Sequence, residues 1–341
     1  MSQARLDIDA PSVRPTAARR AWMFFVRTPS LWTYVVLILL GIVFTVLSGG
    51  TFGNASNLRN ILLDGSLLMV ISVGMTAVII TGGIDLSVGA ITIFGSVAAA
   101  QVMNGIGGDS FAVMFAGFVA AILAGIAWGA VNGVLVSYAR VAPLIATLGT
   151  LGMATGLALV ITNGINARSV PLPLVLVLGN GNIFDVPWLV VVAVIVTVLG
   201  ILYLNKTRAG LYLYAIGSNR DGTMRAGVRV RANTVSVYVI AGALAGLAGY
   251  LSLARFATTS LAGHTTDNLA AIAAVVLGGT SLFGGRGGIS GTIAGVLIPV
   301  VLSNGFVILG IQPFWQQFAI GLVLVLAVYT DHLRRRRVEN E

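Results

Sequence analysis

The sequence predicts an all-α polytopic membrane protein with about ten transmembrane helices. Of its 341 residues, 57% are apolar and only 9% are charged, and the mean hydropathy is +0.96. A soluble domain carries about 25% charged residues, so these few charges cannot cover so much apolar surface in water. The composition excludes an ordinary cytosolic enzyme, a disordered chain and a disulfide-stapled secreted domain, because the chain also has no cysteine.

The intervals between charged residues place the predicted helices, since a membrane span needs about 20 mostly apolar residues. The final interval, 287–330, is long enough for two helices and is divided at Gly310 and Pro313. The third and eighth helices are short, and each can be a re-entrant segment instead of a full span. The ten predicted helices are 31–48, 62–81, 90–103, 111–138, 143–163, 187–205, 234–253, 268–282, 291–309 and 314–330.

The basic residues predict the orientation of the chain. Three segments, 1–30, 206–231 and 331–341, hold 15 of the 20 basic residues, and an even number of helices puts all three on one side. Positive loops stay in the cytoplasm, so this side is predicted to be cytoplasmic. The net charge of +9 is then a property of membrane topology and predicts no nucleic-acid partner.

The same charges divide the chain into a disordered basic leader over 1–30, a membrane domain over 31–330 and a basic tail over 331–341. A cleaved signal peptide over residues 1–48 is the disfavoured alternative, because the basic leader is long and no A-x-A-like site follows the apolar stretch.

Sequence signatures of enzymes are absent. The chain contains no G-x-x-x-x-G-K-[ST], G-x-S-x-G or H-E-x-x-H motif, and its two histidines, His264 and His332, are expected to be polar surface groups. We therefore predict no catalytic residue, no metal site and no cofactor, and a membrane-embedded enzyme is a remote alternative.

Two acidic residues, Asp64 and Asp85, lie near the apolar spans. Asp85 could line a polar path, or it could cap the helix that follows it, and capping is the favoured interpretation. Asp64 lies about one turn inside its predicted helix, at the depth of the membrane interface.

A weak internal repeat relates Gly82–Gly89 (GGIDLSVG) to Gly278–Gly285 (GGTSLFGG) at an offset of 196 residues. Glycine-interrupted segments in corresponding halves of a transporter indicate a substrate path, although the abundance of glycine leaves chance matching as an alternative. The residues predicted to line this path are Gly82, Gly83, Asp85, Ser87, Asn268, Gly278, Gly279, Thr280 and Ser281.

The loop 206–231 is the longest polar segment between predicted helices. Ser218 with Asp221 fits a capping box that opens a short helix, and Gly227 fits the end of that helix. Composition alone favours a solvated connector, with a docking element for a cytoplasmic partner as the alternative.

Over residues 57–330 the chain resembles the permease subunits of bacterial ATP-binding-cassette importers for monosaccharides, of the ribose, xylose, arabinose and galactose type. The resemblance is carried by Gly74–Ala90, Ala142–Thr147, Thr162–Gly164, Thr207–Asn219 and Ala270–Gly285. It implies a bacterial inner-membrane permease that works by alternating access and that binds its sugar or polyol weakly in transit.

The resemblance also implies partners: a second permease copy or close paralogue, a cytoplasmic ABC ATPase, and a periplasmic or lipid-anchored sugar-binding protein, all assembled in membrane lipid. It makes the polar loop an ATPase-coupling segment, formed by Ser218, Asn219, Arg220, Asp221, Gly222, Thr223, Met224, Arg225, Ala226 and Gly227. The chain departs from the family pattern at Asp267–Ala273 and at Asp221–Met224, positions that bear on which sugar is carried and on the docking contacts.

The alternative is a gradient-driven secondary transporter or channel for a small polar solute, since ten helices with a repeat also fit that class. Such proteins use intramembrane ionisable groups for coupling, and here only Asp64 and Asp85 are candidates.

Overall fold

The computed structural model describes residues 29–312 and scattered residues between 314 and 329. The leader, the tail and most of the predicted helix 314–330 lie outside the described residues. The helices are α2 (Pro29–Leu47), α3 (Ala55–Ile80), α4 (Val88–Ile106), α5 (Phe111–Ser137), α6 (Pro143–Thr162), α7 (Trp188–Lys206), α8 (Arg208–Ser218), α9 (Arg220–Arg225), α10 (Val230–Phe256), α11 (Asp267–Leu277) and α12 (Ile289–Ile308).

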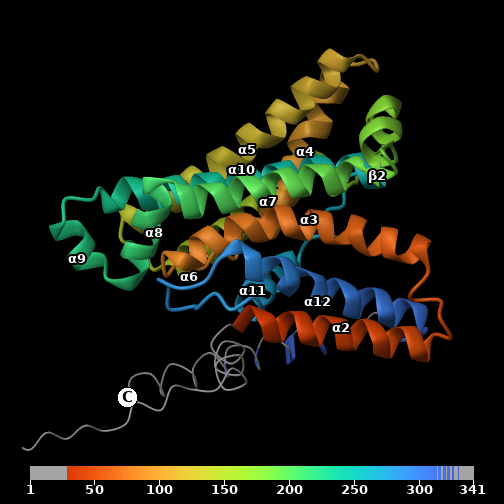
Figure 1. Cartoon of the computed structure of the whole chain (residues 1–341). Helices are drawn as coiled ribbons and strands as arrows, with labels where there is room; N and C mark the ends of the chain where they lie inside the picture. The colour runs from red at the N-terminus through yellow and green to blue at the C-terminus, as the bar shows by residue number, and fades with distance from the viewer. Residues whose placement is uncertain are drawn as a thin grey trace, which may run out of the picture.

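The fold within these residues is almost entirely helical, as the composition predicts (Figure 1). A π-helical turn, η1 (Leu174–Gly179), and a two-stranded antiparallel hairpin, β1 (Asn182–Ile183) with β2 (Val186–Pro187), lie between α6 and α7. Neither the π-helical turn nor the hairpin was predicted from the sequence, because each is too short to produce a periodic pattern.

Within the part of the chain that the structure describes, seven helices are long and apolar enough to cross a membrane, namely α3, α4, α5, α6, α7, α10 and α12. The eleven residues of α11 rise only about 17 Å, well short of the roughly 30 Å hydrocarbon core, so the eighth predicted helix is short as expected. The predicted third helix was too short: α4 has 19 residues, because its helix continues past Asn104 and Gly105.

The interval rule also placed the start of α3 too late. The helix begins at Ala55, seven residues before the predicted start at 62, and the added turns contain Arg59, where a charge-free rule stops. Arg59 donates to the Asn182 side chain (2.8 Å), and Asp64 accepts from Arg255. Paired in this way, both charges are tolerated within an otherwise apolar helix.

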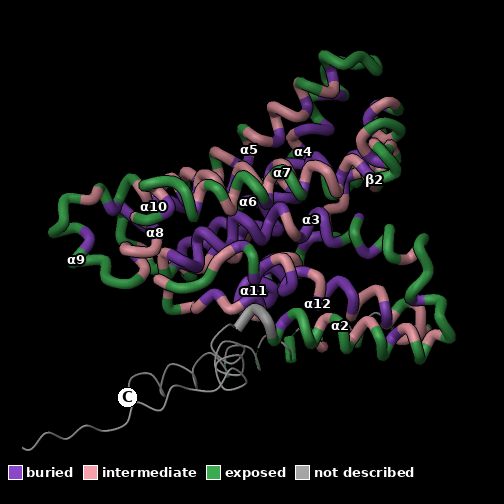
Figure 2. Tube along the Cα trace, in the orientation of Figure 1, coloured by how far each residue is buried: buried purple, intermediate pink, exposed green. Residues whose placement is uncertain are grey.

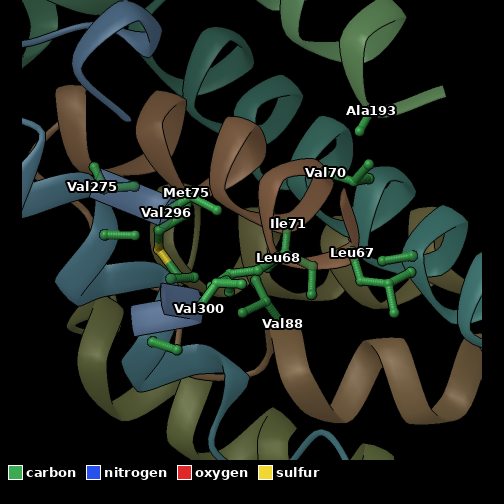
Figure 3. Packing of buried hydrophobic residues seen from close by; sticks show 14 of the residues in the cluster. Leu67, Leu68, Val70, Ile71, Met75, Val88, Ala193, Val275, Val296 and Val300 are labelled. Carbon is green, nitrogen blue, oxygen red and sulfur yellow. The ribbon is translucent and has the colours of Figure 1, made fainter. Parts of the chain in front are cut away.

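Helix α3 runs through the centre of the molecule and organises its core (Figures 1 and 2). In the most apolar 18-residue stretch of α3, 94% of the residues are buried, against 22% in the corresponding stretches of α5 and α7. The central cluster joins α3 side chains such as Leu68, Ile71 and Met75 to Val275 of α11 and Val296 of α12 (Figure 3). The apolar outer faces of α5 and α7 are therefore the surfaces available to lipid.

Glycines bring α5 and α10 into close contact. A Cβ on Gly125 would meet the Gly242 carbonyl, and one on Gly246 would meet the Ala121 carbonyl, so neither position has room for a side chain. Close backbone approach through small residues is the usual way in which membrane helices associate. The 43 glycines of the chain make such close contact possible here.

The elements also give the molecule two distinct ends. Helices α8 and α9 lie at one end, and the connection between α2 and α3 lies at the opposite end (Figure 1). The C-terminal end of α3 and the loop that follows α11 both meet the end of α8.

Candidate functional site: two helix breaks joined to the α8–α9 segment

The first break follows α3. Gly82 N–H donates to Ile79 O (2.9 Å) and Gly83 N–H to Val78 O (3.1 Å), with Gly82 at φ +76°. This is a Schellman ending, in which a left-handed residue lets the chain leave the helix and glycine carries no steric penalty. The chain is then non-helical until α4 begins at Val88.

The second break follows α11 and repeats this geometry. Gly279 N–H donates to Val276 O (2.9 Å), Thr280 N–H donates to Val275 O (3.2 Å), and Gly279 lies at φ +90°. Gly279 therefore corresponds to Gly82 at an offset of 197, whereas alignment of the letters gave 196. The letters match at four positions at an offset of 196 and at one position at 197, so only the helix ending, and not the repeat as a whole, follows the offset of 197.

Side chains from distant helices satisfy the exposed backbone of the first break. Leu86 N–H donates to Thr147 Oγ1 (3.1 Å) from α6, and Leu86 O accepts from Asn268 Nδ2 (2.9 Å) at the start of α11. The Thr147 hydroxyl also bonds Ile84 O (3.3 Å). Since non-helical backbone in a membrane protein must find internal partners, these two side chains hold the break open as an extended segment.

A chain of buried polar groups then leads from Asp85 into α5 and α6. Asp85 Oδ1 accepts from the N–H (2.8 Å) and Oγ (2.6 Å) of Ser87, and Ser87 Oγ accepts from Asn132 Nδ2 (2.8 Å). Asn132 Oδ1 accepts from Thr150 Oγ1 (2.6 Å). All four side chains are fully buried, so the chain locks α4, α5 and α6 around the break.

The favoured interpretation of Asp85 as the cap of α4 is wrong, because the N-cap is Ser87 and no side chain caps this helix. The carboxylate accepts the N–H of Ser87, the residue that precedes the first helical residue of α4, instead of an N–H inside the helix. Asp85 and Ser87 are completely buried, and within the described residues Asp85 Oδ2 has no hydrogen-bond partner.

The two breaks meet each other and the α8–α9 segment. Gly285 N–H donates to Ile80 O (2.9 Å), which ties the loop after α11 to the last turn of α3. Gly217, near the end of α8, packs against both of these backbone groups, and the Tyr214 hydroxyl donates to Gly287 O (3.0 Å). We call this contact of Ile80, Gly217 and Gly285 the inner junction.

The polar loop is more than the solvated connector that composition favoured. It contains a second helix, α8, whose Leu213 and Ile216 are buried against the bundle. The pattern missed α8 because its apolar residues are interrupted by Gly210 and Gly217, which serve close packing.

The short helix predicted in this loop exists as α9, with a different cap. Asn219 Oδ1 accepts from Gly222 N–H (2.8 Å), so Asn219 caps α9, whereas Ser218 closes α8. Gly227 lies just beyond the helix at φ +83°, as predicted for its end. Apart from the buried Thr223, the residues of α9 are exposed and free to face a partner.

The predicted path residues thus fall into two groups. Near the inner junction, the loop after α11 contains Gly279, Thr280 and Ser281. Gly82 lies beside this loop, and Gly83 follows Gly82 in the chain. Gly278 packs against Gly291. Asp85, Ser87 and Asn268 lie instead along the extended segment. Sequence reasoning missed Asn132, Thr147 and Thr150, although an Asn within the apolar stretch of α5 is a signal that could have revealed the first.

His264 is not the surface group that the sequence suggested. It is buried, with Nε2 2.8 Å from Ser252 Oγ and Nδ1 2.7 Å from Asp267 Oδ2. This Ser–His–Asp arrangement could not be predicted from the sequence, because His264 has one partner on α10, Ser252, and one on α11, Asp267. Ser252 is itself buried, so the arrangement fixes the loop before α11 and presents no exposed nucleophile.

Comparison with known proteins shows the family to which this chain belongs. The family model described as the branched-chain amino acid transport system permease component matches residues 57–328, most of the chain. The chain belongs to this family of transport permeases. No solved structure matches it.

Several curated relatives are similar to this permease over nearly their whole length. The ribose import permease of Escherichia coli K12 is 38% identical over 303 residues, covering 88% of this chain and 92% of the relative. The fructose import permease of Rhizobium meliloti is 32% identical over 328 residues, covering 94% and 90%. The D-allose transport system permease of Escherichia coli K12 is 33% identical over 302 residues, covering 88% and 91%.

Proposed function

We propose that this permease is the membrane subunit of an ATP-binding-cassette importer for a monosaccharide or related polyol. The inner junction carries the proposal, because it connects an exposed segment, α9, through α8 to both helix breaks at once. Similarity to permeases named for ribose, fructose and allose supports the sugar class. The ATPase that drives transport would be a separate cytoplasmic subunit.

The geometry suggests how such a motor would act. An ATPase docked on α9 would move α8, and Gly217 would transmit that movement to the Gly285–Ile80 hydrogen bond. Opening or closing this contact would expose the breaks alternately to the two sides of the membrane. The glycines at the breaks leave space and conformational freedom for that change.

Several elements of the assembly remain part of the proposal. The coupling segment would be Ser218–Gly227, the path would follow the two breaks, and a second copy of the permease and a sugar-binding protein on the outer side would complete the complex. Both chain ends and α8–α9 would face the cytoplasm, as the basic segments predict.

The competing function is a secondary transporter. Its strongest support is Asp85, a buried carboxylate with one oxygen lacking a partner in the described residues. The two hydrogen bonds from Ser87 hold this carboxylate in the chain of buried polar groups that joins α4, α5 and α6, so its position has a structural explanation without ion coupling.

The test is ATP-driven uptake by the complete complex in proteoliposomes. Reversing the charges of the exposed α9, with Asp221→Lys and Arg225→Glu together, should reduce uptake at least tenfold and weaken copurification of the ATPase, because complementary charge guides docking. The matched control is Asp109→Lys, which changes an exposed residue between α4 and α5 and should leave uptake unchanged. Uptake by the permease alone on an ion gradient would instead establish the secondary transporter.

A further inference from the structure

A cavity of about 580 Å³ lies in the half of the bundle away from α8–α9. Its walls come from the first half of α3, the start of α11, the second half of α12 and the connection that follows α10. The volume falls within the roughly 300–1,000 Å³ typical of small-molecule sites. None of the path residues predicted from the sequence lines this cavity.

Two carboxylates face the cavity, and each has a partner that holds it in place. Asp64 accepts from Arg255 Nη2, and the Asp64 side chain remains 48% exposed. Asp267 Oδ2 bonds His264 Nδ1, and the Asp267 side chain remains 24% exposed. A carboxylate offers about four acceptor positions, so one bond to its partner leaves each able to accept from the hydroxyl groups of a ligand.

The charge in this region disfavours anions. Among the described residues that line the cavity there is no lysine or arginine. The nearby Arg255 is paired with Asp64 through Nη2, and its buried Nη1 has no hydrogen-bond partner among the described residues. A phosphorylated or carboxylated solute would therefore approach two acidic side chains, with the charge of Arg255 already balanced by Asp64.

An aromatic wall completes the lining. Phe256, the last residue of α10, is 50% exposed and lines the cavity, and the Arg255 guanidinium lies 5.4 Å from the centre of its ring. An aromatic ring provides a rigid apolar surface, while the opposite carboxylates accept hydrogen bonds. A ligand with C–H groups on one face and hydroxyl groups around its edge satisfies both.

The cavity is connected to the first break through residues of its wall. His264 and Asp267 line it, the His264 carbonyl packs against Gly89 of α4, and Asn268, which follows Asp267, bonds Leu86 O. The segment that separates α3 from α4 therefore contacts residues in or next to the wall of the cavity without lining it.

We propose that this cavity is a transient binding site for a neutral polyhydroxylated solute, whose hydroxyl groups donate to Asp64 and Asp267 and whose C–H face rests on Phe256. This inference rests on the proposed function and adds to it the class of solute and the residues that select it. Binding would be weak, because a translocation site must release its ligand.

The absence of cysteine from the chain makes a direct test possible in its full-length form. Ser260 lines the cavity, and in Ser260→Cys a membrane-impermeant thiol reagent can report occupancy as a slower rate of labelling. The probes are D-ribose, D-fructose and D-allose at millimolar concentration, with ribose 5-phosphate as the anionic comparison. Asp109→Cys, an exposed site outside the cavity, is the matched control.

At least one neutral sugar should slow labelling of Ser260→Cys severalfold, without effect on Asp109→Cys, and ribose 5-phosphate should not. Adding Asp64→Asn, Asp267→Asn or Phe256→Leu should remove the protection. The proposal is overturned if no neutral sugar protects, if the phosphate ester protects equally, or if protection survives all three substitutions. Protection needs no ATPase, so protection without ATP-driven uptake would contradict the proposed function alone, and uptake without protection would contradict this site alone.

Discussion

At the scale of single residues, Gly83 in the first break has no room for a side chain. A Cβ built there would lie 2.7 Å from the Tyr238 hydroxyl oxygen and 3.2 Å from Val78 Cγ1. Tyr238 is fully buried, and its hydroxyl has no hydrogen-bond partner among the described residues. The tightest contact that excludes a side chain is therefore with an oxygen atom that has no hydrogen bond of its own.

This contact predicts a rescue. Gly83→Ala should destabilise the permease by about 1–3 kcal/mol, the usual cost of overpacking, and should lower uptake. Adding Tyr238→Phe removes the clashing oxygen and should restore most of both, while Tyr238→Phe alone should be neutral or slightly stabilising because it removes an unsatisfied buried group. Thermal unfolding of the purified chain and uptake by the complex measure the two effects. Equal loss in the single and double variants would show that Gly83 is needed for backbone freedom instead of space.

At the scale of elements, α8 is the part that links the exposed α9 to the breaks. Its Gly217 packs on the two backbone groups of the Gly285–Ile80 hydrogen bond. A methyl group at this position must push the end of α3 away from the loop after α11. In contrast, a Cβ on the nearby Gly288 would find its nearest neighbour, the Tyr214 hydroxyl, at 3.7 Å, an ordinary contact.

We therefore expect Gly217→Ala to reduce uptake about tenfold or more, the effect of an overpacking cost of 1–3 kcal/mol on the closed junction. Copurification with the ATPase should persist, since α9 is untouched. Gly288→Ala should behave as the unmodified protein in both assays. Normal uptake by Gly217→Ala would mean that the inner junction stays intact or has no part in transport.

The elements also show which features a sequence can reveal. Each helix predicted from the charge-free intervals within the described residues is present in the structure, because lipid demands long apolar segments. They misplaced the start of α3, because Arg59 finds its partner, Asn182, far away in the chain and so continues the helix past a charge. They also gave no sign of α8, which is held by burial of a few side chains and by glycine contacts with the breaks.

The candidate site divides in the same way. The glycines of the two breaks could be found because a left-handed backbone leaves a mark in the sequence. Thr150 and His264 could not be assigned, because their roles come from partners elsewhere in the chain, whereas Asn132 was recognisable as an amide within an apolar stretch. The left-handed glycines that end α3 and α11 are offset by 197 residues, whereas the letters of the repeat align at 196, and only hydrogen bonding shows where each helix ends.

At the scale of the whole molecule, orientation follows from the distribution of basic residues. Of the basic residues that the predicted topology assigns to one side of the membrane, only Arg59, Arg168 and Arg255 fall on the outer side. Two of these three are engaged within the bundle, Arg59 with Asn182 and Arg255 with Asp64, so they satisfy local partners. The remaining asymmetry favours the side that carries α8 and α9 as the cytoplasmic one.

This orientation can be measured with reporter proteins whose signal depends on the side of the membrane. Fusions at both chain ends and within 206–231, after Asn205, should all report the cytoplasm, while a fusion between α4 and α5, at Asp109, should report the outside. Replacing Lys206 and Arg208 with glutamine should weaken this preference without reversing it, because most of the basic residues on that side remain. If the chain ends and the α8–α9 segment reported opposite sides, an ATPase could not reach the inner junction in the orientation proposed, and the cavity at the other end could not receive solute from outside.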